Sequence, residues 1–86
     1  MSRIVVKLGG AVAASAAQRV VDLAREHEVA VVHGAGPQIT ERMVRQGLPI
    51  EFVGGRRVTS AEALAIVTEA LAEVNEQICD TIGALA

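Results

Sequence analysis

The chain has 86 residues, of which 51% are hydrophobic, and its formal net charge is −2 at pH 7. These values predict one small folded unit with a modest core. Phe52 is the only aromatic residue, which together with the negative charge argues against nucleic-acid modules that stack bases on aromatic side chains. The single cysteine, Cys79, excludes an internal disulfide framework, so we expect a protein of the reducing cytoplasm.

Membrane and targeting signals are not expected. No apolar run approaches the roughly 20 residues that a membrane-spanning helix needs. Lys7 interrupts the N-terminal apolar run too early for a signal peptide. Charge is uneven: the chain up to Arg57 holds eight basic and five acidic residues, and the remainder holds five acidic residues and no basic one. A positive first part suits an anionic substrate, whereas the acidic last part is typical of a solvated helix face.

The first elements predict a strand–helix–strand unit. Continuous apolar residues predict buried strands at Ile4–Leu8 and Val29–Val32. Between them, Ser15 is predicted to cap a helix that runs to about His27. The predicted apolar face of this helix comprises Ala16, Val20, Leu23, Ala24 and His27. Because a helical crossover makes two strands parallel, the loops after both strands should open at the same sheet edge, where α/β sheets bind ligands.

A second helix is predicted from Pro37, which suits a first helical turn, to Gly47. Its apolar positions are Ile39, Met43 and Val44. Gly54 and Gly55 then separate two short strand-like runs, Ile50–Val53 and Arg56–Thr59, which predicts a hairpin.

A long last helix is predicted after a capping box formed by Thr59, Ser60, Ala61 and Glu62. Its apolar residues recur at alternating spacings of three and four, at Leu64, Val67, Leu71, Val74 and Ile78. Such a stripe packs on a sheet, on a neighbouring helix or on a second subunit.

The first candidate site is Lys7 followed by Gly9 and Gly10. Lys7 is the only lysine, and it stands near the end of an apolar strand. Glycines let backbone N–H groups approach an anion, and the ammonium group neutralises it, so this arrangement favours phosphate binding over a plain turn. Neither the Walker A spacing nor the full Gly-x-Gly-x-x-Gly fingerprint is present.

The second candidate site is Gly34-Ala35-Gly36, immediately before Pro37. Free N–H groups at a helix N-terminus favour a carboxylate or a phosphate, although close packing of strand and helix is an alternative explanation. His33, at the end of the preceding strand, is expected to be a hydrogen-bonded structural residue rather than a base.

Arg56 and Arg57 are the third candidate. An arginine on a hairpin arm can clamp a carboxylate, and the other then faces solvent because strand neighbours point in opposite directions. Two solvated arginines are an equal alternative. The sequence contains no evident Ser/His/Asp set and no pair with metal-ligand spacing, so no protein-bound metal is expected.

Together, these segments resemble the amino acid kinase family, and within it the kinases that phosphorylate N-acetyl-L-glutamate. The resemblance rests on Val5–Gly10, Val31–Ile39 and Glu51–Thr59, and it extends to Val74-Asn75-Glu76 in the last helix. It implies a three-layer α/β/α sandwich with a mainly parallel sheet, of which residues 1–86 form the N-terminal, acyl-substrate-binding part. The nucleotide-binding part has no counterpart in this sequence, so no turnover is expected from these residues alone.

The resemblance also implies a reaction, in which the γ-phosphoryl group of ATP moves to the γ-carboxylate of N-acetyl-L-glutamate in arginine biosynthesis. Lys7 would stabilise the transferring phosphoryl group, with Gly9 and Gly10 along the phosphates and Mg²⁺ held through the nucleotide. Gly34, Ala35 and Gly36 align with the backbone that holds the acyl substrate, and Arg57 aligns with the arginine that binds its α-carboxylate. The kinases of this family that act on N-acetyl-L-glutamate are homodimers, so the resemblance also implies a homo-oligomer, most simply a dimer.

Two departures from the family pattern leave alternatives open. Ala35 stands where the family usually has glycine, which is harmless only if its φ is negative. The hairpin reads Gly54-Gly55-Arg56-Arg57 where the family usually has Asn-Gly-Leu-Arg. A kinase of the same fold that acts on carrier-protein-linked glutamate or aminoadipate, or on another acyl or phosphate acceptor, is therefore an alternative. Another is a non-catalytic α/β module that binds small anions or a partner subunit.

Overall fold

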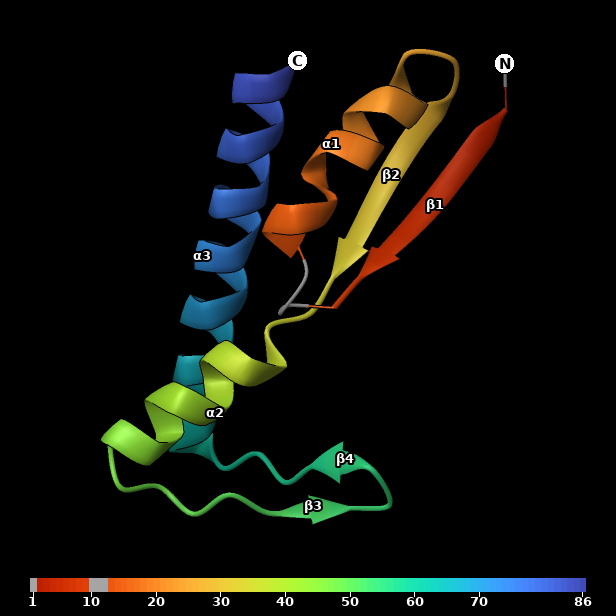
Figure 1. Ribbon diagram of the computed structural model, residues 1–86. Coiled ribbons are helices and arrows are strands. Elements are labelled where there is room, and N and C mark those ends of the chain that lie inside the picture. Colours follow the sequence, from red (N-terminus) through yellow and green to blue (C-terminus); the bar gives the residue numbers. More distant parts are fainter. Residues whose placement is uncertain (1, 10–12) are drawn as a thin grey trace.

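The computed structural model describes residues 2–9 and 13–86. Two parallel strands, β1 (Arg3–Leu8) and β2 (Glu28–His33), are joined through helix α1 (Ala13–Ala24) (Figure 1). Helix α2 (Gly36–Arg45) follows β2 directly. The described chain ends with a small hairpin of β3 (Phe52–Val53) and β4 (Arg56–Arg57) and the long helix α3 (Ala61–Leu85). The α/β class and the parallel strand pair are therefore as predicted.

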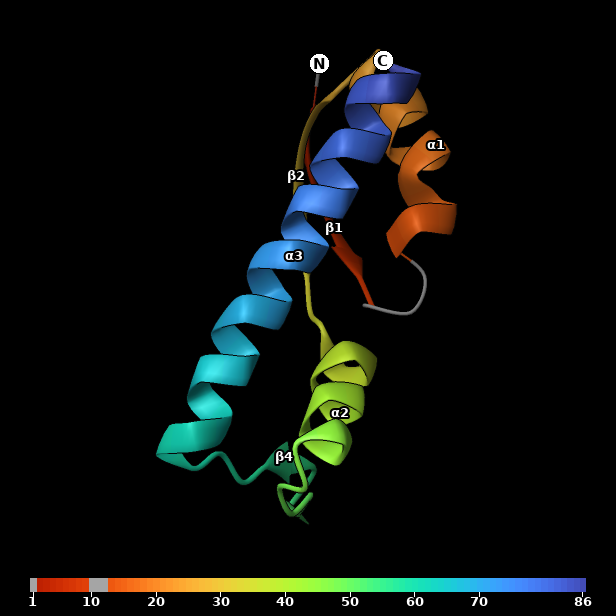
Figure 2. The ribbon, with the colours of Figure 1, turned by 90° about the vertical axis from the view of Figure 1, so that its left-hand side faces the viewer.

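Helix α3 packs against both of the other helices. It runs alongside α1 over one half of its length and alongside α2 over the other (Figures 1 and 2). The main core joins side chains from the sheet and all three helices: Leu8, Val20, Ala35, Ile39, Met43, Ala63, Ile66, Ala70, Val74 and Ile78. None of these helices, within the described part of the chain, is long and apolar enough to cross a membrane.

The sheet is covered on one face only, which corrects the prediction of fully buried strands. Burial alternates along β1 and β2, and α1 lies to one side of the sheet (Figure 2). On the opposite face Val5 is 71% exposed and Val32 51% exposed. The molecule is also elongated, with a radius of gyration of 15.0 Å, whereas a compact domain of this length has about 12 Å. Val5 and Val32 are thus open to a further partner or segment.

Helix α1 differs from its prediction at both ends. It begins at Ala13, so Ser15 lies inside the helix instead of capping it, and it ends at Ala24 instead of His27. Its most deeply buried residues are Ala17, Val20 and Val21, whereas Leu23 and Ala24 are exposed. The buried face is rotated from the predicted one because α1 packs on α3 as well as on the sheet.

Helix α2 ends at Arg45, two residues before the predicted end, and Gly47 terminates it. Gly47 has a φ of +69°, which favours glycine. Leu48 N donates to Met43 O at 2.9 Å, and Gly47 N donates to Val44 O at 3.1 Å, which together form a Schellman motif. Ile39 and Met43 are buried as predicted, but Val44 is 62% exposed because it lies on the solvent side of the last turn.

The hairpin is also as predicted, although its strands are shorter. Gly54 and Gly55 have φ values of +57° and +79°, which match the two-residue type I′ turn. The bond from Val58 N to Glu51 O, 2.8 Å long, extends the pairing beyond the two short strands.

The N-cap of α3 lies one residue later than predicted, and the helix begins at Ala61. The N-cap is Ser60, whose Oγ accepts from Ala63 N at 3.1 Å, so Thr59 and Glu62 do not form the predicted box. The predicted stripe is also partly wrong, since Leu64 is 57% exposed and Leu71 36% exposed. Val74 and Ile78 are buried as predicted, together with the smaller Ala63 and Ala70 and with Ile66.

Candidate functional site at the carboxyl edge of the sheet

Lys7 and the two glycine loops lie at one edge of the sheet. Lys7 is paired with Val32, and Leu8 with His33, so Gly9 and Gly34 leave the sheet at the same edge. Lys7 is exposed, and its position in the alternation places it on the face opposite α1. Gly10 lies outside the described residues. The parallel register therefore brings the end of β1, with Lys7, and the loop that follows β2 to the same edge of the sheet, as predicted.

The loop that follows β2 leads directly into the N-terminus of α2. Ala35 is the N-cap, with φ −148° and ψ 31°, and it makes no side-chain capping bond. Its negative φ meets the condition under which alanine can replace glycine, and its methyl group is buried in the core. A helix N-terminus without a side-chain cap presents backbone N–H groups and positive potential to an anion.

Gly34 and Gly36 are not required by the fold of the described chain. Neither has a positive φ, and a Cβ built on either would meet no atom within 4 Å. The space beside the loop is open, so a ligand can approach the backbone closely. This is a different role from that of Gly54 and Gly55, whose positive φ values form the hairpin turn.

Arg57 reaches from the hairpin to this loop. Its Nη2 donates to Thr40 Oγ1 at 2.8 Å and to Gly36 O at 3.3 Å, while Nη1 lies 3.6 Å from Met43 Sδ. The guanidinium carbon stands 4.8 Å from the centre of the Phe52 ring, a cation–π distance. The guanidinium group is thus held against the first two turns of α2 from several directions.

Arg56, by contrast, is exposed, and no hydrogen bond or ion pair of it appears among the described contacts. The two neighbours therefore behave differently, as the alternation of a strand predicts. The structure brings Arg57 together with Gly36 and leaves Arg56 toward solvent.

His33 connects the site to α3. Its Nε2 lies 3.2 Å from Asn75 Oδ1, and its Nδ1 lies 3.2 Å from Gly34 O. Both ring nitrogens have neighbours in the fold, in agreement with the structural role predicted for this residue. Asn75 was not predicted as its partner, because 42 residues separate the two and no local pattern connects them.

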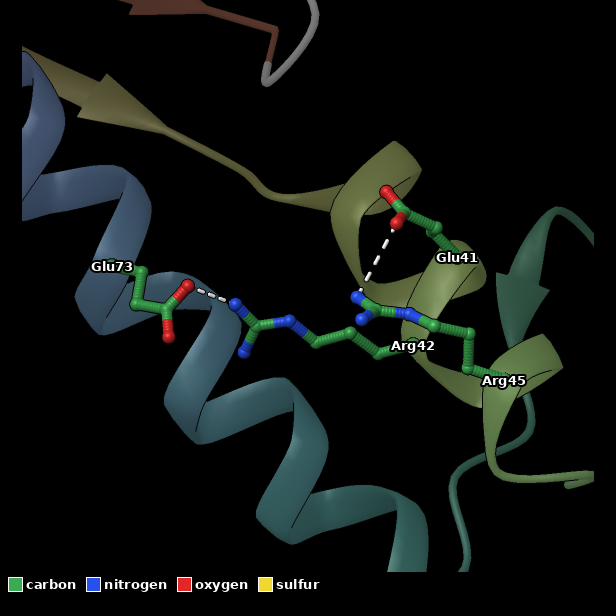
Figure 3. A network of polar contacts seen from close by, with 4 residues as sticks. All are labelled: Glu41, Arg42, Arg45 and Glu73. Atoms are coloured by element: carbon green, nitrogen blue, oxygen red, sulfur yellow. Dashed lines mark hydrogen bonds and ion pairs between the residues drawn. The ribbon is translucent and has the colours of Figure 1, made fainter.

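A charged cluster between α2 and α3 was also not predicted. Arg42 forms an ion pair with Glu73, and Arg45 pairs with Glu41 at 3.3 Å (Figure 3). A hollow of about 350 Å³ beside these ion pairs is lined by Arg42, Arg45, Gln46, Glu69 and Glu73. The pair of Arg42 and Glu73 links α2 to α3, whereas the pair of Arg45 and Glu41 lies within α2. Because each arginine is paired with a glutamate, the cluster has no excess positive charge for an anionic ligand.

No cluster of metal ligands accompanies the site. Among residues 2–9 and 13–86, no three His, Cys, Asp or Glu side chains gather closely enough to hold a metal ion.

Comparison with known proteins decides the family. The sequence model of the amino acid kinase family matches residues 2–86. The chain belongs to the amino acid kinase family. It is 39% identical to the acetylglutamate kinase of Solibacter usitatus over 98% of the chain, and 37% identical to that of Acidobacterium capsulatum over 96%.

A solved structure supports the same fold for this family member. The crystal structure of smu.665 from Streptococcus mutans UA159 matches 96% of the chain with a TM-score of 0.78 and 25% sequence identity. The chain spans 37% and 35% of the two curated relatives and 36% of the solved structure. It thus corresponds to about a third of the length of the proteins that it matches.

Proposed function

We propose that this chain is the N-terminal, acyl-substrate-binding part of an acetylglutamate kinase. The proposal is supported by the names of its relatives and by the share of their length that it spans. The activity would need the remaining part of such a protein to bind ATP, so turnover is not expected from residues 1–86 alone.

The observation that carries the proposal is the position of Arg57 beside the loop Gly34–Gly36. A fixed guanidinium group lies next to uncapped backbone N–H groups and open space. Such an arrangement favours a ligand with a carboxylate and a neighbouring polar group. N-acetyl-L-glutamate fits this description, with its α-carboxylate on Arg57 and the remainder of the molecule along the loop.

Lys7 would act at the reacting end of the ligand. An oxygen of the γ-carboxylate would attack the γ-phosphorus of ATP, the bond from that phosphorus to the β–γ bridging oxygen would break, and ADP would leave. The products are an acyl phosphate and ADP. The ammonium group of Lys7, with the backbone of Gly9 and Gly10, would offset the charge that develops on the phosphoryl oxygens. Mg²⁺ would be carried by the phosphates of the nucleotide, as is general for phosphoryl transfer from ATP.

Titration calorimetry with the purified chain tests the proposal, because Arg57 and Arg56 form a matched pair. The parent and the Arg56→Ala variant should bind N-acetyl-L-glutamate with similar affinity, whereas Arg57→Ala should lose measurable binding. Equal loss in both variants, or none in either, would contradict the assignment. Stronger binding of a carrier-linked glutamate would move the function to the kinases that act on such substrates. Binding of sulfate and phosphate but not of N-acetyl-L-glutamate would favour a non-catalytic anion-binding module.

A further inference from the structure

Thr40 holds the carboxylate-binding arginine in place, although it belongs to a different element. Its hydroxyl oxygen accepts the shortest hydrogen bond that Arg57 makes, at 2.8 Å from Nη2. Thr40 lies on α2, one turn after Gly36, and its side chain is half-buried. The hydroxyl of Thr40 therefore links α2, whose N-terminus follows the loop Gly34–Gly36, to the hairpin that carries Arg57.

The contacts of Arg57 are divided among its nitrogen atoms in a way that gives Thr40 a specific role. Nη2 donates to both Thr40 Oγ1 and Gly36 O, and among residues 2–9 and 13–86 Nη1 has only the long contact with Met43 Sδ. Phe52 supports the guanidinium plane without accepting a hydrogen bond. Within the described part of the chain, Thr40 is thus the only residue whose side-chain oxygen accepts a hydrogen bond from the guanidinium group of Arg57. Without it, the guanidinium group would rotate more freely over the Phe52 ring.

We infer that Thr40 is a positioning residue, which fixes the guanidinium group of Arg57 at the N-terminus of α2 before the ligand carboxylate arrives. This inference rests on the proposed function, in which Arg57 binds the carboxylate. Ligand affinity increases when the donor is already held in its bound position, because less side-chain freedom is lost on binding. Thr40 therefore acts on affinity through Arg57 and has no contact with the reacting atoms.

Three threonine variants test the inference by calorimetry with N-acetyl-L-glutamate. Thr40→Val keeps the shape and removes the acceptor, and it should weaken binding about tenfold, as expected for a hydrogen bond to a charged group. Thr40→Ser restores the hydroxyl and should bind within about twofold of the parent. Thr68→Val is the control, because the Thr68 hydroxyl bonds only to Leu64 O within α3. Parent-like affinity of Thr40→Val, or failure of Thr40→Ser to rescue, would overturn the inference.

A second measurement needs no ligand and separates this inference from the proposed function. Urea unfolding of the parent, Thr40→Val, Arg57→Ala and the double variant forms a double-mutant cycle. Thr40→Val should lower the unfolding midpoint in the parent and leave it unchanged in the Arg57→Ala background. An equal decrease in both backgrounds would show that Thr40 does not act through Arg57. If the cycle shows coupling while the parent binds no N-acetyl-L-glutamate, the proposed substrate is wrong and the positioning of Arg57 stands.

Discussion

Met43 should contribute more to stability than any neighbouring residue of α2. Among the residues that the structure describes it is the largest fully buried side chain, 1% exposed. It packs between α2 and α3, and its sulfur touches Arg57. Truncation of a buried methionine to alanine costs about 2 to 5 kcal/mol, since it removes apolar burial and leaves a cavity. A folded unit of this size is stable by roughly 4 to 13 kcal/mol. Met43→Ala should therefore remove a large fraction of the free energy of unfolding.

Urea denaturation, followed by circular dichroism at about 222 nm, measures this effect in a chain that has no Trp or Tyr. The midpoint should fall by at least about 1 M, with an unchanged slope of free energy against urea. Val44→Ala is the matched control, because Val44 is adjacent and 62% exposed. It should change the free energy of unfolding by less than about 0.5 kcal/mol. Equal effects of the two variants would refute the packing described for α2.

Three further variants test the loop, the lysine and the exposed face of α3. Gly36→Ala should leave the thermal midpoint unchanged or raised, because nothing obstructs the added methyl group, and yet it should weaken binding of N-acetyl-L-glutamate in calorimetry. Unchanged affinity would show that the open space beside Gly36 does not hold the ligand. In an enzyme that joins this chain to the remaining part of the Solibacter usitatus relative, Lys7→Ala should lower kcat by about 10² to 10³, equivalent to about 3 to 4 kcal/mol, with little change in KM. An unaltered kcat would remove Lys7 from the reaction. The isolated chain should associate with itself in light scattering at micromolar concentration, and Leu71→Glu should reduce this, because Leu71 is an exposed apolar residue on α3. A monomeric parent would contradict the expectation, and association unaffected by Leu71→Glu would move the contact to another face.

The local features of the fold could be predicted because their causes lie within a few residues. The glycine pair of the hairpin and Gly47 at the end of α2 adopt positive φ values that other residues disfavour. That the loops after both strands open at the same edge of the sheet could be predicted, because a helical connection makes the two strands parallel. Strand alternation predicted that Arg56 and Arg57 would face opposite directions, although not which of them would face solvent.

Packing between distant elements could not be predicted in the same way. The sequence pattern of α3 favoured Leu64 and Leu71 for burial because they are large and regularly spaced. The structure instead buries Ala63 and Ala70, since small side chains allow neighbouring helices to approach closely. Which face of the sheet is exposed depends on which other elements pack against it. The apolar residues within each strand do not reveal which elements those are.

The candidate site could likewise be predicted only in part. Residue type and spacing indicated Lys7, the loop Gly34–Gly36 and the pair Arg56 and Arg57. The family resemblance alone pointed to Arg57 within that pair. The contact between Arg57 and Thr40 was not, because 17 residues separate them and threonine is common in helices for many reasons. Only the packing of the hairpin against α2 reveals that this hydroxyl faces the guanidinium group.

The most direct test of the account is phosphoryl transfer by the joined enzyme, with hydroxylamine to trap the acyl phosphate. With ATP, Mg²⁺ and N-acetyl-L-glutamate, the folded enzyme should form the hydroxamate, and Arg57→Ala should reduce its formation far more than Arg56→Ala. A joined enzyme that is folded by circular dichroism and binds ATP, but forms no hydroxamate from N-acetyl-L-glutamate, would contradict the central claim.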